Sequence, residues 1–539
     1  MTSVLLHRAR LSKDAQAHRS TVSLVWDQTG YTLREWWRSR VFFIFTFLVP
    51  LTVLVVLGFV FGTQTIEGTG VPIMQVVTPN AIAVGVLFAA FPPVASTVAQ
   101  ARETGVLKRV RGTPLRPWVY LAGRLAGAVA FALGSLLTLV VVAVSFYGVR
   151  IMWSTALATT VTVVVAVACF AALGLAVATL ARSAGVADAA SFGAVMVLSY
   201  VSGVFSDGSQ TASAGRVADV LPLKPFADAL RAQFDPSAAG SGWDVRALAI
   251  MAAWTLGATV VAARAFRSDP HQTASRGSPV PRTDGAPVSV AVTAELRATA
   301  PGRPSTAAML LTQVRHITVA AWRDVGWVVF AVAVPVGQFA YLAYSVAPAA
   351  ADVTVNGLPY LLATAAGMMT WGAAITCFIF MPDALVRARD QKLLKRLRGT
   401  PLTPEVYAGG RILSALVIAY VTAVLVLAVG VAFFALSVSW AGLPLATVVL
   451  LLGSATLGAC GIALAAHLPS SNAVVAVGLA VLMPLSFFSN VIVFPGLPAW
   501  MGTVGSLFPL KHMADSVARP SRLAARPSAG RAWRYSPPG

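Results

Sequence analysis

The sequence predicts an all-α, polytopic membrane protein: a helical bundle of two homologous, six-helix-type halves with about 11 transmembrane helices. Three observations predict it. Of the 539 residues, 57% are hydrophobic and only 11% are charged, and the mean hydropathy of +0.76 is far above that of a soluble domain. Apolar runs long enough to cross a bilayer recur along the chain. One short basic stretch, flanked by such runs, occurs twice.

The duplicated stretch organises the rest of the chain. Its first copy reads Lys-Arg-Val-Arg-Gly-Thr-Pro-Leu over residues 108–115, and its second reads Lys-Arg-Leu-Arg-Gly-Thr-Pro-Leu over residues 395–402. The copies are 287 positions apart, as are the Pro-Leu-Lys triplets at 222–224 and 509–511. An offset shared by separated motifs indicates an internal duplication. Because three cations in four residues enter a bilayer core only at high cost, each copy must lie at a membrane surface.

The first half is expected over residues 41–263, after a cytoplasmic segment of residues 1–40. Apolar, aromatic and basic side chains mix from residue 22 onwards, which predicts an amphipathic helix in the membrane interface rather than the alternative, a disordered basic tail. Six spans follow, at 41–61, 76–100, 119–146, 155–180, 187–205 and 247–263. Prolines interrupt the second span, so neighbouring helices must satisfy the backbone groups that these prolines free.

The second half is expected over residues 313–515, after a linker at 264–312 whose Pro, Ser, Thr, Ala and Arg content predicts disorder. Its spans are at 325–347, 358–381, 406–436, 445–466 and 474–494. The repeat then breaks, because residues 516–539 hold five arginines, four prolines and no apolar run, and such a basic tail cannot span a bilayer. Eleven spans are therefore expected, with the last helix of the second half missing and the tail outside.

The basic side chains define the sidedness. They gather in the N-terminal segment, the linker and the loops that hold the duplicated stretch, whereas the loop after the first span of each half has no Lys or Arg. The positive-inside rule then predicts a plasma-membrane protein with a cytoplasmic N-terminus, linker and duplicated stretches. Six spans in the first half give both halves the same orientation. The net charge of +20 is attributed to this topology and not to nucleic acid binding.

Several classes of site are disfavoured by the residue pattern. No lysine follows a glycine, so the chain lacks the Gly-Lys-Ser/Thr of a P-loop and cannot itself be an ATPase. Cys169, Cys377 and Cys460 all lie in apolar runs, where small buried residues are expected. Histidines are scattered, which disfavours a membrane-embedded enzyme. Asp188, Arg124 and Arg411 lie near span ends, where such side chains snorkel to the interface.

The residues from Arg102 to Leu115 resemble the signature of ABC-2 type permeases, the membrane subunits of ABC exporters, here as two permease halves fused in tandem. The resemblance implies that the duplicated stretch is a coupling helix contacting two copies of a separate cytoplasmic ATPase subunit. ATP and magnesium would then be bound by that partner, and no cofactor by this chain. The alternative is a plain cytoplasmic loop, which explains the charge but not the recurrence of Arg-Gly-Thr-Pro-Leu.

The resemblance carries over two sets of residues. The implied ATPase-coupling residues are Glu103, Gly105, Lys108, Arg109, Arg111, Gly112, Thr113, Pro114, Asp390, Lys395, Arg396, Arg398, Gly399, Thr400 and Pro401. The second copy departs from the pattern, since Gln391-Lys392 replaces Thr104-Gly105. An outer re-entrant segment is also implied, with Pro222, Lys224, Asp228, Pro509, Lys511 and Asp515. The alternative for that segment is a solvated loop.

The function expected from these observations is that of the transmembrane permease of an ABC exporter. It would form the path for an amphiphilic substrate, such as a drug or antibiotic, a secondary metabolite or a lipid-like molecule, in contact with membrane lipid. The alternative is an ion- or proton-coupled secondary transporter. That alternative needs a titratable relay inside the membrane, and the expected spans carry no acidic residue at mid-depth.

Overall fold

The computed structural model of the protein describes residues 21–39, 43–62, 64–65, 70–111, 117–204, 212–237, 240–265, 305–323, 329–345, 354–355, 357–397, 399, 402–492 and 499–518. These residues are almost entirely helical. The strands among them are Thr354–Val355 (β1) and Leu358–Pro359 (β2), which pair antiparallel. Eight of the described helices are long and apolar enough to cross a membrane, and three shorter apolar helices accompany them. The all-α prediction is confirmed.

The first half begins with the amphipathic helix expected from the sequence. Its elements are α2 (Thr21–Arg38), the π-helical turn η1 (Ile44–Leu48), α4 (Val49–Phe61), α5 (Ile73–Glu103), α6 (Val106–Arg111), α7 (Pro117–Tyr147), the short turn η2 (Trp153–Thr155), α8 (Ala156–Leu180), α9 (Ala184–Val201), α10 (Ala212–Val220), α11 (Leu223–Phe234) and α12 (Val245–Ala265). Each of the six expected spans of this half thus coincides with a described helix.

The second half repeats this order up to its outer helices. Its elements are α14 (Thr306–Arg323), the π-helical turn η3 (Val329–Ala333), α16 (Val334–Ser345), α17 (Tyr360–Ala374), the π-helical turn η4 (Ile375–Phe380), α18 (Met381–Asp390), α19 (Leu393–Leu397), α20 (Pro404–Phe434), the short turn η5 (Trp440–Gly442), α21 (Leu443–Ala466), α22 (Ser471–Phe488), α23 (Ala499–Gly505) and α24 (Pro509–Ala518). α14 begins inside the expected linker. Linker residues 266–304 and tail residues 519–539 lie outside the described residues.

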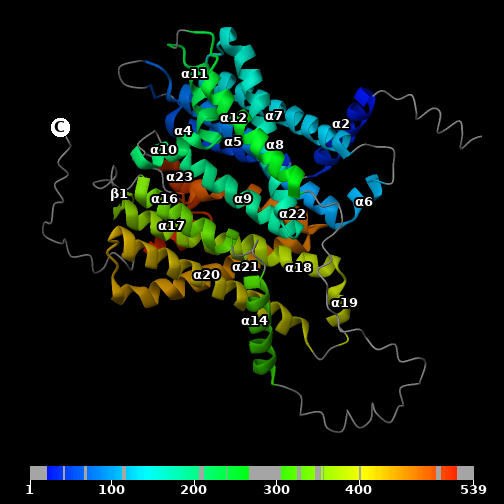
Figure 1. Ribbon diagram of the computed structural model, residues 1–539. Helices are drawn as coiled ribbons and strands as arrows, with labels where there is room; N and C mark the ends of the chain where they lie inside the picture. Colours follow the sequence, from blue (N-terminus) through cyan, green and yellow to red (C-terminus); the bar gives the residue numbers. More distant parts are fainter. Residues whose placement is uncertain are drawn as a thin grey trace, which may run out of the picture.

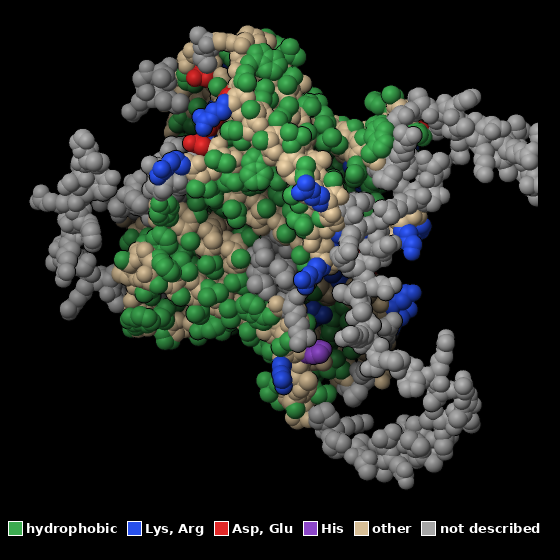
Figure 2. Space-filling view, viewed as in Figure 1, with side chains coloured by type: hydrophobic (Ala, Val, Ile, Leu, Met, Phe, Trp, Pro, Cys, Tyr) green, Lys and Arg blue, Asp and Glu red, His purple; other side chains and the backbone are tan. Residues whose placement is uncertain are grey.

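The two halves form one bundle with two distinct ends. α6 and α19 lie at one end, whereas β1, α10, α11 and α23 lie toward the other (Figure 1). Hydrophobic side chains cover most of the surface between these ends (Figure 2). The halves meet where α4 packs against α22 and where α9 packs against α16. Val56, Phe487 and Met501 form a buried cluster at the first contact, and the rings of Tyr200 and Tyr341 lie 4.9 Å apart at the second.

A proline near the start of the first span is stabilised by a neighbouring helix. Pro50 has no N–H with which to bond the carbonyl group of Thr46, four residues earlier. The hydroxyl of Ser135 on α7 donates to that carbonyl oxygen at 2.8 Å. Gly85 on α5 leaves the space for this contact, because a Cβ there would lie 3.0 Å from Ser135 Oγ and 3.3 Å from Pro50 Cγ. Three spans therefore meet at one proline–hydroxyl–glycine junction.

The second half contains the same junction. Thr422 Oγ1 on α20 donates at 2.9 Å to the carbonyl oxygen of Ala331, which lies four residues before Pro335. A Cβ on Gly372 would lie 2.8 Å from Thr422 Cγ2 and 3.2 Å from Pro335 Cγ. Each π-helical turn, η1 and η3, directly precedes the helix that carries the proline. The duplication therefore extends to hydrogen bonds between helices that no motif in the sequence indicates.

The cysteines do not all behave as expected. Cys169 and Cys377 are buried, but Cys460 is exposed. Cys460 lies on α21, the second-half counterpart of α8. α8 is covered by α12, and the described part of the second half contains no helix equivalent to α12. The prediction of a buried Cys460 was wrong because it assumed that every span has neighbours on all sides.

Candidate functional site

Each duplicated stretch follows a sharp break in a long incoming helix. α5 ends at Glu103, and Gly105 adopts a left-handed backbone with φ of 70° before α6 begins. In the second half α18 ends at Asp390, and Lys392 adopts φ of 58°. In the left-handed conformation a lysine is about 1–2 kcal/mol less favourable than a glycine, yet the second half keeps the turn. The turn therefore has the same backbone geometry in both halves, although Gly105 in the first half corresponds to Lys392 in the second.

The hydrogen bonds at the two breaks correspond pair by pair. The Gly105 N–H donates to the Arg102 carbonyl at 3.1 Å, and the Lys392 N–H donates to the Arg389 carbonyl at 3.0 Å. One residue earlier, each N–H donates at 2.9 Å to the carbonyl four positions before it. These bonds satisfy the carbonyl groups that a helix C-terminus leaves free. Both stretches are thus held in one fixed backbone arrangement.

An arginine at each break ties the stretch to the connection that follows the fourth span of its half. Arg102 is buried and donates to the carbonyl oxygens of Ala178 at 2.9 Å, Thr179 at 3.3 Å and Ala181 at 2.5 Å. These carbonyls lie at the C-terminus of α8, where a cation is favourable. Arg389 Nη2 donates at 2.9 Å to the carbonyl of Leu468, just beyond α21 and 287 positions after Ala181. Neither arginine was predicted to be a site residue from the sequence.

Glu103 has an intramolecular partner. Its Oε1 accepts a hydrogen bond at 2.8 Å from the N–H of Ala184, the first residue of α9. A carboxylate is stabilising at this position, because helix N-termini carry unpaired N–H groups and partial positive charge. The corresponding Asp390 Oδ1 lies 3.4 Å from Arg389 Nε. Glu103 therefore joins α5 to the start of α9, in addition to any contact with a partner.

α6 is held by one apolar side chain and exposes its cations. Leu107 is buried and packs with Ala101 and Tyr120, whereas Lys108 and Arg109 are exposed. In the second copy Lys395 is exposed, and Gly399 lies in an exposed turn. The side chains of Arg111 and Arg396 are not described, and Gly112, Thr113, Pro114, Arg398, Thr400 and Pro401 lie outside the described residues. The described part of each copy thus presents a cationic surface at one end of the bundle.

The amphipathic helix α2 packs closely against the span that follows the first stretch. A Cβ on Gly123 of α7 would lie only 2.4 Å from Gln28 Cβ, and a Cβ on Gly127 would lie only 2.6 Å from Thr32 Cγ2. Only glycines at these two positions therefore permit the close approach of α2. Arg124 between them is buried, and its Nη2 lies 3.0 Å from Glu35 Oε2 of α2. Arg124 does not snorkel as expected. The Gly-x-x-x-Gly spacing was the available signal for this helix contact.

The second half repeats this packing, although α14 itself carries no acidic residue. A Cβ on Gly410 of α20 would lie 2.8 Å from Gln313 Cβ on α14. Arg411 Nη2 donates to the Tyr407 hydroxyl at 2.9 Å, as Arg124 Nη2 does to the Tyr120 hydroxyl at 3.0 Å. Both amphipathic helices therefore lie against the first turns of the span that leaves a duplicated stretch.

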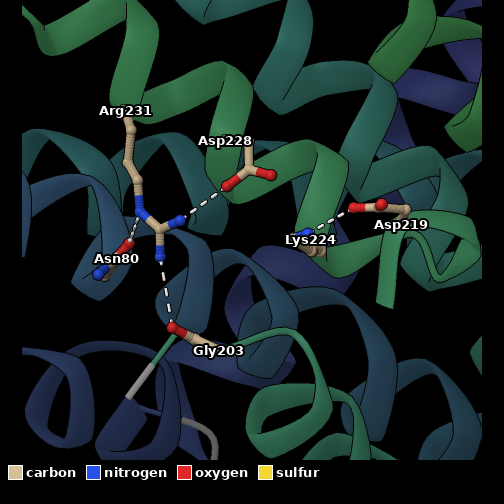
Figure 3. Close-up of polar contacts among 6 residues, drawn as sticks. All are labelled: Asn80, Gly203, Asp219, Lys224, Asp228 and Arg231. Carbon is tan, nitrogen blue, oxygen red and sulfur yellow. Dashed lines mark hydrogen bonds and ion pairs between the residues drawn. The ribbon is translucent and has the colours of Figure 1, made fainter. Parts of the chain in front are cut away.

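The outer segment of the first half consists of two packed helices, α10 and α11. Arg231 donates through Nε to Asn80 Oδ1 at 2.8 Å and through Nη1 to Asp228 Oδ1 at 2.7 Å, and Lys224 pairs with Asp219 (Figure 3). Leu223, Phe226 and Leu230 are fully buried. Burial raises the pKa of Asp228, and the nearby Arg231 and Lys224 oppose that rise. The segment is folded against α5 rather than solvated.

The outer network is not duplicated. Pro509 begins α24, and Lys511 Nζ lies 3.5 Å from Asp515 Oδ2. Ala518 and Gly367 occupy the positions that correspond to Arg231 and Asn80. The two halves therefore share in detail the end that holds the duplicated stretches, and they differ at the opposite end.

Two acidic side chains lie inside spans near the cationic end. Asp383 is buried, and Arg387 Nε donates a hydrogen bond to its Oδ2 at 2.8 Å. Ser96 and Gln100 occupy the equivalent positions of the first half, where Gln100 Nε2 donates to Ser96 Oγ at 2.9 Å. Asp188 on α9 lies near Ser96 and interacts electrostatically with Arg387 of the other half. Asp383 was not predicted from the sequence, because α18 extends beyond the span expected at 358–381. Among the described residues no His, Cys, Asp and Glu group of three or more could hold a metal ion.

Comparison with known protein families returned one model, described as ABC-2 type transporter, which matches residues 27–234 and again residues 312–519. Each match begins within an amphipathic helix, α2 or α14, and extends through the outer helices of its half. Together the two matches cover most of the chain. Comparisons with curated proteins and with solved structures returned no match.

Proposed function

The chain belongs to the ABC-2 type transporter family and is thus a multi-pass membrane permease that associates with an ABC ATPase; we propose that it is an exporter whose two cationic helices, α6 and α19, receive the motion of two ATPase subunits. The observation that carries this proposal is that α6 and α19 lie at the same end of the bundle, each at the same backbone break (Figure 1). In this arrangement the N-terminus and both helices are cytoplasmic.

Force applied to α6 would reach three spans. Arg102 connects the break to the end of α8, Glu103 connects it to the start of α9, and the chain itself continues into α5. In the second half Arg389 connects the break to the end of α21. Because α9 packs against α16 of the other half, a push on α6 would also move the contact between the halves. This is the rigid-body rocking that alternating access requires.

The substrate proposed for this path is amphiphilic. The contact between the halves combines the apolar cluster of Val56, Phe487 and Met501 with the phenol groups of Tyr200 and Tyr341. Such a surface suits a molecule with a large apolar body and a few hydrogen-bonding groups. For the ion-coupled alternative, Asp188 and Asp383 are the candidate titratable groups, and both lie toward the cationic end of their spans rather than along a relay.

Charge reversal at the two helices tests the coupling. We expect Arg109→Glu combined with Lys395→Glu to weaken co-purification of the ATPase and abolish ATP-dependent transport in proteoliposomes, because both side chains are exposed cations. Arg216→Glu on α10 is the matched control, since it reverses an exposed cation at the outer end. Full ATPase binding and transport in the double variant would show that these residues do not couple the subunits. Transport without ATPase or ATP would instead support the ion-coupled alternative.

A further inference from the structure

Two equivalent arginines beneath the amphipathic helices differ in how their charge is balanced. Arg124 Nη2 lies 3.0 Å from Glu35 Oε2 on α2. Arg411 Nη2 donates to the Tyr407 hydroxyl at 2.9 Å, and its guanidinium carbon lies 5.3 Å from the centre of the Tyr407 ring. Within the described part of the chain no carboxylate pairs with Arg411. The charge is therefore neutralised in the first half and left unbalanced there in the second.

The cause is a single position on α14. In each half a glutamine of the amphipathic helix packs on the glycine that precedes the arginine, and these glutamines, Gln28 and Gln313, are 285 positions apart. With the same offset Glu35 corresponds to Ala320, which is exposed. A methyl group cannot pair with a cation. The side of Arg411 that a carboxylate would cover is therefore open.

The Arg411 guanidinium also has unused hydrogen-bonding capacity. Its Nε is buried and has no partner among the described residues. Arg124 likewise leaves Nη1 without a partner, so the unbalanced charge, and not the number of hydrogen bonds, distinguishes the two arginines. Removing a cation from bulk water is costly unless an anion accompanies it. The second half thus presents a partly enclosed cation that lacks its anion.

The surroundings of Arg411 are those of a membrane interface. α14 lies crosswise to α17 and α20 (Figure 1) and exposes the apolar side chains of Leu311, Val319 and Trp322. A helix with these features lies in the headgroup region, where the anions are lipid phosphates. α14 also carries two arginines and one histidine and no acidic residue, whereas α2 carries two residues of each sign. Only the second of these helices is thus suited to an anionic surface.

We propose that Arg411, the Tyr407 hydroxyl and the exposed side of α14 around Ala320 bind the phosphate group of an anionic phospholipid. A phosphate oxygen would occupy the place that the Glu35 carboxylate has in the first half, because a guanidinium binds both groups with the same geometry. His316 lies one turn before Ala320 on the exposed side of the helix and would face the same headgroup.

A lipid fits this site better than an acidic side chain of the ATPase. The exposed apolar side chains of α14 suit acyl chains, and Arg411 lies within the first turns of a span. In the proposed orientation the lipid belongs to the cytoplasmic leaflet. The site is separate from α6 and α19 and depends neither on the substrate nor on the direction of transport.

An intramolecular carboxylate tests the site. We expect Ala320→Glu to place a carboxylate against Arg411, as Glu35 lies against Arg124, and to weaken binding of phosphatidylglycerol about fivefold or more. Ala320→Gln has the same size without the charge and should bind like the parent. Native mass spectrometry of the full chain in detergent, titrated with phosphatidylglycerol or phosphatidylcholine, would measure the bound lipid. Phosphatidylcholine should bind more weakly than phosphatidylglycerol to the parent.

The first half provides the reciprocal variant. Glu35→Gln leaves Arg124 without its carboxylate and should add one bound phosphatidylglycerol per chain. Ala320→Glu should not lower the melting temperature, because Ala320 is exposed. If it does, Arg411→Gln replaces it and should lose the same lipid.

The remaining outcomes would overturn the proposal. Equal phosphatidylglycerol binding by Ala320→Glu and Ala320→Gln would show that Arg411 does not hold the lipid. Displacement of the lipid by inorganic phosphate would identify a site for a free anion. Loss of the ATPase from Ala320→Glu, with lipid binding unchanged, would assign Arg411 to the ATPase. Additional lipid bound by Asp324→Asn would identify Asp324, which lies outside the described residues, as the partner of Arg411.

Discussion

At the scale of single residues, the duplication preserves contacts more faithfully than identities. Gly105 and Lys392 adopt the same left-handed turn, and Arg102 and Arg389 both bond the connection that follows the fourth span of their half. Other positions have diverged in charge. Asp383 and Arg387 in the second half correspond to the neutral Ser96 and Gln100 in the first half. The cationic ends therefore share a backbone framework, while the polar pair just inside the membrane is neutral in one half and charged in the other.

The left-handed turn predicts a specific stability effect. We expect Gly105→Ala to lower the free energy of unfolding by about 1 kcal/mol, because a Cβ is unfavourable at φ of 70° although nothing lies within 4 Å of it. Gly185→Ala in α9 is the control, since it also has open space but an ordinary helical backbone, and should be neutral or stabilising. Thermal unfolding in detergent would measure both. Equal melting temperatures for the two variants would contradict the role given to this turn.

At the scale of elements, the first three spans of each half are locked together by one proline, one hydroxyl and one glycine. The hydroxyl groups of Ser135 and Thr422 are both fully buried, and each bonds a carbonyl of the preceding span. The π-helical turns at these places show that the helix ladder is irregular there. Neighbouring helices thus satisfy the backbone around the prolines, as the membrane environment demands.

Removing these hydroxyls is expected to destabilise each half separately. Ser135→Ala and Thr422→Val should each cost about 1–3 kcal/mol, because a buried carbonyl loses a donor that water cannot replace. Thr160→Val is the control, as Thr160 is exposed and bonds only the Ala156 carbonyl of its own helix. Thermal unfolding should show effects of similar size for the two buried positions. A loss confined to one half would mean that the junctions are not equivalent.

At the scale of the whole molecule, two permease halves in one chain already contact each other on both sides. α4 packs against α22, and α9 packs against α16, so each half contributes its first and fifth spans to the contact. Homodimeric arrangements obtain such an isologous contact from two chains. Here the duplication provides both surfaces within one polypeptide.

This arrangement predicts the composition of the complex. One copy of the chain is expected to bind two ATPase subunits, because it carries one cationic helix per half at the same end. Native mass spectrometry of the purified complex would measure the ratio. A complex with two permease chains would contradict this stoichiometry.

The sequence by itself determined the fold class, the positions of the spans, the duplication and the grouping of cations at two connections. These features are local, because hydropathy over about 20 residues and the placement of Pro and Gly decide them without reference to partners. It also located the duplicated stretch to which Lys108, Arg109 and Lys395 belong. Only the tertiary structure decided the partners of Arg102, Glu103 and Arg124, and the exposure of Cys460. Those depend on which helix faces lie together, and that is set by side-chain packing between segments tens of residues apart.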